Sequence, residues 1–144
     1  MPPSIVAITR REEFSASHRL HNPELSPEEN RRLYGVCNNA NGHGHNYEVE
    51  VTVRGLVHEQ TGMVMNLADL MRLLRERVLP QIDHKHLNLD VPFLDGIIPT
   101  AENVAIALWR QIEPEVRRYE GCHLHRIRLF ESRSSFVDYQ GPQS

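Results

Sequence analysis

Three histidines have the types and the spacing that could hold a metal ion. His43 and His45 form a His-x-His pair at the start of a long alternating segment, and His18 lies near the end of an earlier one. Alternate residues of a strand point to one face, so both imidazoles of the pair share the apolar face of Val49 and Val51. Three neutral imidazoles suit zinc and leave its fourth position open, as in catalytic zinc sites. The alternative for each histidine is an ordinary core side chain.

A cysteine shortly before the His-x-His pair adds a second chemical group. A thiol held close to a divalent cation without binding it has a lowered pKa and can act as a base near neutral pH. Cys37 is in the right part of the sequence for this role. Two alternatives stay open: Cys37 could be a fourth, structural zinc ligand, or an inert buried cysteine. Structural zinc sites usually use several thiolates, and only one is available nearby.

Carboxylates supply the remaining candidates. Asp83 and His84 are adjacent in a loop, and a carboxylate that orients an imidazole is a common proton-transfer arrangement, although neighbours in sequence need not touch. Glu131 ends the apolar face of a segment, HLHRIRLFES, where a carboxylate needs hydrogen-bond donors. Its partner could be an internal arginine. It could instead be a ligand whose N–H groups match a carboxylate in a bidentate way, such as a pterin or a guanine.

The composition narrows the class of protein. The chain has 144 residues, a net charge of -3, nine histidines and two distant cysteines, Cys37 and Cys122. Dispersed basic residues argue against nucleic-acid binding, which favours a clustered basic face. No apolar run approaches the length of a membrane span, and no secretory leader is evident, so we expect a cytoplasmic protein without membrane partners.

The elements that must position these residues follow from periodicity. We expect a single domain over residues 1–144, of the α+β class, with a four-stranded antiparallel sheet and two helices on one face in the order ββααββ. A polar loop is predicted from Asn22 to about Arg32, and Thr100 is the predicted N-cap of the second helix. The predicted strands span 4–20, 43–54, 123–131 and 135–139, and the first helix spans 66–79.

Six separated motifs together resemble those of the 6-pyruvoyltetrahydropterin synthase family. They are FSASHRL, CNNANGHGHNYEVEVTV, TGMVMNLADL, DHKHLNLDVPF, TAENVA and FES, in this order and at this spacing. The similarity runs from about Arg10 to Gly141. One departure lies at the start of the second helix, where many animal members carry Thr-Thr-Glu-Asn and this chain has Thr-Ala-Glu-Asn after Pro99.

The resemblance implies a T-fold, also called a tunnelling fold, in which subunits join their sheets into a barrel, usually within a hexamer. Active sites of the family lie at subunit contacts. By the same resemblance, each candidate residue has a role. The zinc ligands are His18, His43 and His45, the catalytic base is Cys37, the proton relay is Asp83 and His84, the pterin anchor is Glu131, and further pterin contacts are Thr100 and Glu102.

The reaction implied by the resemblance is the zinc-dependent conversion of 7,8-dihydroneopterin triphosphate to 6-pyruvoyltetrahydropterin with loss of triphosphate. Within the family, the alternative is a 6-carboxytetrahydropterin synthase of the queuosine pathway, which also releases acetaldehyde. Outside it, a cupin metalloenzyme is disfavoured by two amphipathic helices and by the absence of the cupin glycine pattern. A non-catalytic module stabilised by zinc is the third alternative, and it predicts that replacing Cys37 has no effect.

Overall fold

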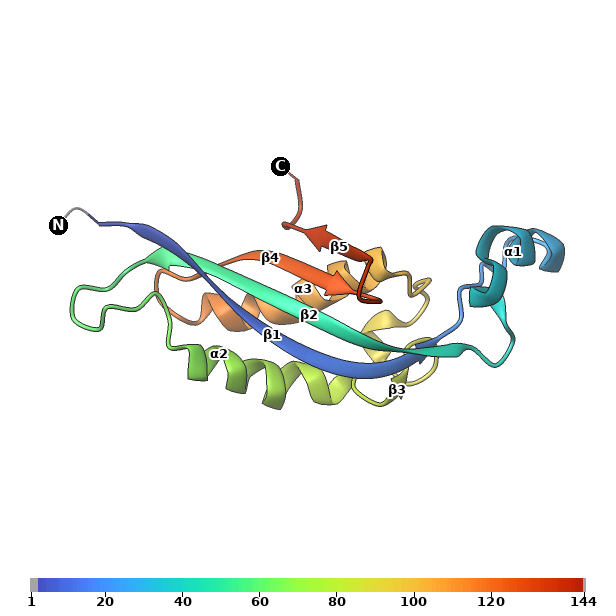
Figure 1. The fold of residues 1–144 in the computed structure, drawn as a ribbon, viewed down its shortest axis with the longest axis horizontal. Helices are drawn as coiled ribbons and strands as arrows, with labels where there is room; N and C mark the ends of the chain where they lie inside the picture. Colours follow the sequence, from blue (N-terminus) through green and yellow to red (C-terminus); the bar gives the residue numbers. More distant parts are fainter. Residues whose placement is uncertain (1–2, 144) are drawn as a thin grey trace.

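Two long strands and three shorter ones form a single sheet in this computed structural model, which describes residues 3–143. The strand order is β3-β1-β2-β4-β5. β1 and β2 pair antiparallel along their whole length and run through the molecule from end to end (Figure 1). The strands are β1 (Ile5–His18), β2 (His43–Leu56), β3 (Lys85–His86), β4 (His123–Phe130) and β5 (Phe136–Tyr139).

The prediction of four antiparallel strands is only partly confirmed. The α+β class and the four predicted strands are present, but β3 adds a fifth strand, which pairs parallel with Ala16 and Ser17 of β1. A two-residue strand is too short to show the alternation of polar and apolar residues that identifies a strand in sequence. It therefore lay hidden in the predicted loop between the two helices.

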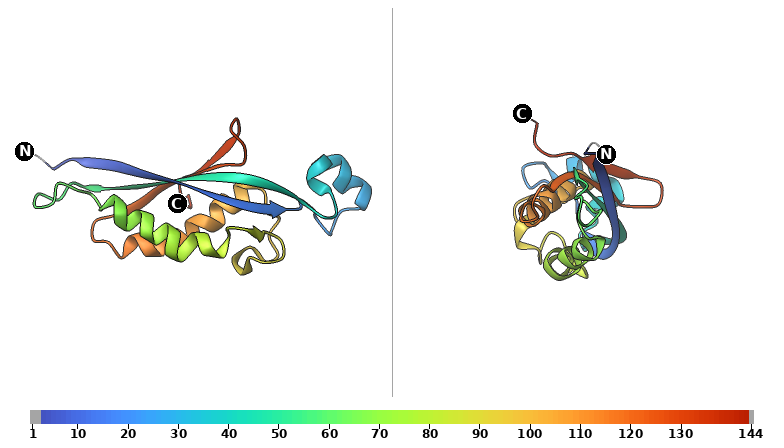
Figure 2. Two further views of the ribbon diagram at one scale, coloured as in Figure 1. Left: turned by 60° about the horizontal axis from the view of Figure 1, so that its bottom comes forward. Right: turned by 90° about the vertical axis from the view of Figure 1, so that its left-hand side faces the viewer.

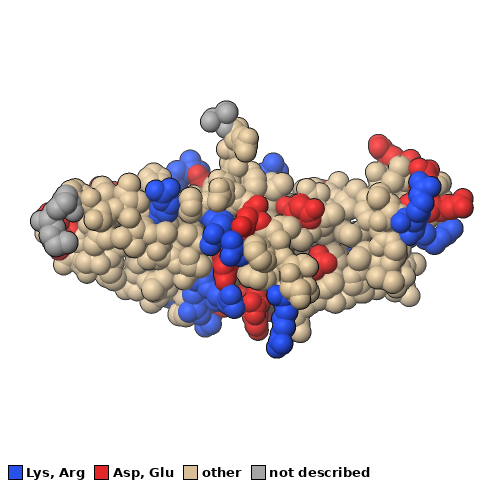
Figure 3. All heavy atoms as spheres, turned by 45° about the horizontal axis from the view of Figure 1, so that its top comes forward, with Lys and Arg blue, Asp and Glu red and all other residues tan. Residues whose placement is uncertain are grey.

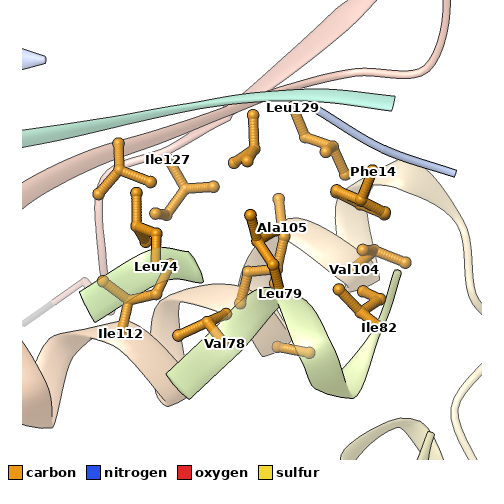
Figure 4. Close-up of a cluster of buried hydrophobic side chains, with 14 of the residues drawn as sticks. Phe14, Leu74, Val78, Leu79, Ile82, Val104, Ala105, Ile112, Ile127 and Leu129 are labelled. Carbon is orange, nitrogen blue, oxygen red and sulfur yellow. The ribbon is translucent and has the colours of Figure 1, made fainter. Parts of the chain in front are cut away.

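Both predicted helices cover the same face of the sheet, as Figure 2 shows. α2 (Leu67–Leu73) continues into a π-helical turn (Leu74–Val78) and a 3-10 turn (Leu79–Gln81), and α3 (Ala101–Arg117) follows. The core lies between these helices and the sheet (Figure 4). Its labelled members include Phe14, Leu74, Val78, Val104, Ile112, Ile127 and Leu129, all buried.

The predicted polar loop after β1 is wrong, because part of it is a helix, α1 (Pro27–Tyr34). Ser26 caps it by accepting a hydrogen bond from the backbone N–H of Glu29, whose side chain accepts one from the backbone N–H of Ser26. This capping box, with proline at the first helical position, is a helix signal that apolar periodicity does not detect. α1 projects from one end of the molecule (Figure 1), and a 3-10 turn (Gly35–Asn38) leads from it toward β2.

The opposite face of the sheet is open and polar. Arg11 pairs across strands with Glu48 and Glu50, and Arg128 pairs with Asp138. Figure 3 shows charged side chains of both signs gathered across the middle of one face of the molecule. Among residues 3–143, no helix combines the length and apolar character needed to cross a bilayer.

Candidate active site

Three imidazoles converge where β1 ends and β2 begins. The antiparallel register places His18 opposite His43 and Ala16 opposite His45, so all three rings lie on the helix-facing side. Nε2 of His45 lies 3.2 Å from Nε2 of His18 and 2.9 Å from Nε2 of His43. One donor atom from each ring lies within 4.8 Å of the others. The predicted convergence of the three rings is confirmed.

The protonation of these rings fits a metal site. Nδ1 of His18 lies 2.8 Å from the carbonyl oxygen of Pro99, and a carbonyl can only accept, so Nδ1 carries the proton. Its Nε2 is left with a lone pair that points at the other two rings. Burial lowers the pKa of both His18 and His45, which favours their neutral form. Three neutral nitrogen donors this close together form a set that suits zinc, and the Pro99 carbonyl behind His18 fixes the orientation of that ring.

Sequence reasoning missed Tyr47, the next residue on this face of β2. Its side chain is fully buried, its ring stacks on Phe14 at 4.8 Å, and its hydroxyl lies 3.4 Å from Nδ1 of His18. Burial raises the pKa of Tyr47, so the hydroxyl stays protonated at neutral pH. A buried tyrosine two residues after a candidate ligand was the available signal, because such a hydroxyl needs a polar partner.

Glu131 lies beside the cluster. It directly follows β4, and its Oε1 is 3.6 Å from Nε2 of His45, with the side chain 30% exposed. Within residues 3–143, the close side-chain partner of this carboxylate is the His45 ring, and no arginine pairs with it. The alternative of an internal arginine partner is therefore not what the structure shows. The carboxylate remains accessible to a ligand at the edge of the histidine cluster.

Cys37 lies in the 3-10 turn after α1 and is partly exposed. Its sulfur is not among the donor atoms that converge with the three imidazoles. Burial, and then the negative charge of Glu131, raise the pKa of the Cys37 thiol in the protein alone. A nearby cation would act in the opposite direction.

Asp83 and His84 do contact each other, with Nδ1 of His84 3.0 Å from Oδ1 of Asp83. The pair is fixed to the edge of β1: Ser15 donates its N–H to Asp83 Oδ1 at 2.9 Å, and its carbonyl accepts from the N–H of His84 at 2.6 Å. The His84 side chain is 81% exposed and borders a hollow whose lining includes Asn46 and also His45 of the histidine cluster. Among residues 3–143, no hydrogen bond or ion pair joins Asp83 or His84 to the three histidines of the cluster.

The start of α3 lies next to the cluster. Thr100 is its N-cap, as predicted, and accepts a hydrogen bond from the N–H of Asn103 at 3.2 Å. Glu102 is exposed in the first turn. Pro99 comes immediately before the cap, and its carbonyl is the one that orients His18. The start of α3 and the histidine cluster are therefore joined by this hydrogen bond.

The sequence belongs to the 6-pyruvoyl tetrahydropterin synthase family, whose pattern it matches over residues 7–142. It is 46% identical over 134 residues to the 6-pyruvoyl tetrahydrobiopterin synthase of Homo sapiens, covering 93% of this chain and 90% of that one. The solved 6-pyruvoyl tetrahydropterin synthase of Caenorhabditis elegans superposes with a TM-score of 0.87 at 38% identity, covering 96% of this chain and 97% of that one. The 6-carboxy-5,6,7,8-tetrahydropterin synthase of Rickettsia bellii is less similar, at 27% identity over 93% of this chain and 99% of that protein.

Proposed function

We propose that this protein is a lyase that converts 7,8-dihydroneopterin triphosphate to 6-pyruvoyltetrahydropterin with elimination of triphosphate, as in tetrahydrobiopterin biosynthesis. The observation that carries this proposal is the group of three converging imidazoles beside Glu131. Family membership and the names of the similar relatives support the pyruvoyl product over the 6-carboxy product.

In this proposal, His18, His43 and His45 hold a zinc ion through their Nε2 atoms. When bound, zinc supplies Lewis-acid chemistry to the substrate. Pro99 fixes the tautomer of His18, and burial keeps His18 and His45 neutral, so the ligand set is ready without large rearrangement.

In this proposal, side chains of the protein transfer the protons and bind the pterin ring. Sγ of Cys37, as the thiolate, removes a proton from the substrate side chain, and the Asp83–His84 pair moves protons at the other positions. The carboxylate of Glu131 accepts N–H bonds from the pterin ring, and Thr100 and Glu102 add contacts from the start of α3. Holding the ring in one orientation brings the reacting carbon to the proton-transfer groups.

The proposal includes a homo-oligomer, a hexamer of T-fold subunits, with active sites between subunits. In its support, Asp83 and His84 lie at the β1 edge, and among the described residues neither makes a hydrogen bond or ion pair to the histidine cluster of the same chain. A second copy would bring such a pair to each cluster. A cytoplasmic location is also proposed, and it is consistent with two cysteines that are both free.

The test is to supply the purified protein with 7,8-dihydroneopterin triphosphate, with zinc present or after chelation. We expect triphosphate and 6-pyruvoyltetrahydropterin with zinc, no turnover after chelation, and no acetaldehyde. Acetaldehyde would instead establish the 6-carboxy reaction.

The Cys37→Ala variant separates the enzyme from a zinc-stabilised module. We expect a folded protein that binds zinc but turns over at least about 100-fold more slowly, as is typical when a general base is lost. If the variant turned over like the wild type, Cys37 would not be the base.

A further inference from the structure

The segment that carries Cys37 is held to the rest of the chain mainly by polar groups. We call residues 22–38, which comprise α1 and the 3-10 turn after it, the cysteine lobe. Two of its large apolar side chains face solvent: Leu33 is 63% exposed and Val36 is 74% exposed. Two of its polar residues, Asn30 and Asn38, are buried instead. Because the lobe lies beyond the helices that cover the sheet (Figure 1), amide hydrogen bonds must replace core packing there.

Asn30 organises the lobe internally. Its Nδ2 donates to the carbonyl oxygens of Asn22 at 2.9 Å and Ser26 at 3.0 Å, and its Oδ1 accepts from the N–H of Asn22 at 2.8 Å. These bonds tie the segment that precedes α1 to a residue within α1. They do not reach the metal ligands.

Asn38 makes the connection to the metal ligands. Its Nδ2 donates to the carbonyl oxygen of Leu20 at 2.8 Å and lies 3.1 Å from Nδ1 of His21. Two further bonds run between the same segments: the N–H of Leu20 donates to the carbonyl of Cys37 at 2.8 Å, and Nε of Arg19 donates to the carbonyl of Asn38 at 3.0 Å. Residues 37–38 and residues 19–20, which directly follow the ligand His18, are therefore joined by three hydrogen bonds.

The exit of β1 is itself held from the other side. The N–H of Arg19 donates to Oδ1 of Asn88 at 2.8 Å, and Nδ2 of Asn88 donates back to the carbonyl of Arg19 at 2.8 Å. Residues 19–20 are therefore held by Asn88 on one side and by the cysteine lobe on the other. This gives the cysteine lobe a fixed point of attachment. A side chain that bonds to it sets the distance from Cys37 to His18.

We infer that Asn38 is a positioning residue, whose side-chain amide holds Cys37 in register with the histidine cluster. The expected loss of kcat rests on the proposed function. The expected displacement of Cys37 rests only on the hydrogen bonds described above. Displacing a reacting group by about 1 Å can cost on the order of 100-fold in rate. Loss of the Asn38 amide removes its contacts with Leu20 and His21. The two bonds to the backbone carbonyls of residues 37 and 38 remain. We therefore expect a smaller loss in kcat, of about tenfold.

The experiment compares Asn38→Ala with Asn39→Ala in the zinc-loaded protein. Asn39 is the matched control because it is the next residue, of the same type, and exposed, with no side-chain hydrogen bond among those described. For Asn38→Ala we expect kcat to fall about tenfold, with KM and zinc affinity unchanged, and for Asn39→Ala no change. Equal kcat in the two variants would overturn the inference.

Alkylation by iodoacetamide, mapped to each cysteine by mass spectrometry, tests the positioning without the reaction. We expect Asn38→Ala to speed alkylation of Cys37 and to leave Cys122 unreacted, since Cys122 is buried in the core and reports general unfolding. Unchanged Cys37 alkylation overturns the inference even if kcat falls. If Asn38→Ala sped alkylation of Cys37 but the wild type showed no turnover of the substrate, the positioning role of Asn38 would stand and the proposed function would be refuted.

Two further variants cover the case in which Asn38→Ala does not fold. Asn38→Asp keeps the shape of the side chain and removes the donated N–H groups, and Arg19→Met removes the bond to the Asn38 carbonyl from a partly exposed position. Both should speed Cys37 alkylation while Cys122 stays protected. Wild-type alkylation rates in both variants would overturn the inference.

Discussion

At the scale of single residues, His18 connects the histidine cluster to the start of α3 and to Tyr47. It is fully buried, its Nε2 belongs to the cluster, and its Nδ1 has two oxygen neighbours, the Pro99 carbonyl at 2.8 Å and the Tyr47 hydroxyl at 3.4 Å. The shorter contact has ordinary hydrogen-bond geometry and the longer one is at the limit. The backbone carbonyl therefore orients the ring, and the tyrosine hydroxyl supports it.

The variants Tyr47→Phe and His18→Ala should therefore differ strongly in zinc affinity. We expect less than about a tenfold loss for Tyr47→Phe, because the Pro99 contact persists, and more than about a 100-fold loss for His18→Ala, which removes a ligand outright. Competition titration with a colorimetric zinc chelator measures both. A Tyr47→Phe loss as large as that of His18→Ala would mean that the hydroxyl is the main orienting group.

At the scale of elements, the β4–β5 hairpin holds Glu131 beside the cluster. Arg128 of β4 donates two hydrogen bonds to Asp138 of β5, at 2.7 Å and 3.0 Å, and its guanidinium lies over the ring of Phe136 at 4.3 Å. Glu131 itself donates its N–H to the carbonyl of Ser135 across the turn. Hydrogen bonds between β4 and β5, and the bond across the turn, therefore fix the backbone position of Glu131, the proposed pterin anchor.

The pH dependence of this hairpin follows from the Arg128 contact, whose hydrogen bond lowers the pKa of Asp138 below its ordinary value. A lowered carboxyl pKa adds stability above the unfolded-state pKa of about 4, and that stability is lost as the pH falls through the folded-state pKa. We expect Asp138→Asn to lower the urea midpoint modestly at pH 7, because the pair is partly exposed. The difference from the wild type should shrink toward pH 2. A difference that stayed constant with pH would contradict this role of the charge.

The sequence predicted the elements that have strong periodicity and missed those that do not. β1, β2 and α3 were predicted with their faces correct because alternating or helical apolar patterns mark them, and the same alternation predicted the convergence of His43 and His45. β3 is too short to have a period, and α1 has almost no apolar stripe to bury. The orienting role of Pro99 could not be predicted, because it depends on a backbone carbonyl, which every residue type has.

At the scale of the whole molecule, the sheet is covered on one side only. The histidine cluster faces the helices, whereas Asp83 and His84 lie at the β1 edge. Under the proposed function, in which active sites lie between subunits, we expect the histidine cluster and the Asp83–His84 pair of one site to come from different copies of the chain.

Mixing two inactive variants tests this division. Cys37→Ala and His84→Ala, unfolded and refolded together in equal amounts, should regain activity, with about a quarter of the sites intact if each copy is chosen at random. Each variant refolded alone should stay inactive. No recovery in the mixture, with mixed oligomers shown by differential tags, would mean that one chain supplies both groups.

The weak attachment of the cysteine lobe has a consequence for heating. The lobe buries little apolar surface, so its opening depends on a few amide bonds and need not wait for the sheet and its helices to melt. Warming would therefore stop turnover reversibly at a temperature where circular dichroism still reports an intact fold. Cooling would restore the enzyme without any refolding step.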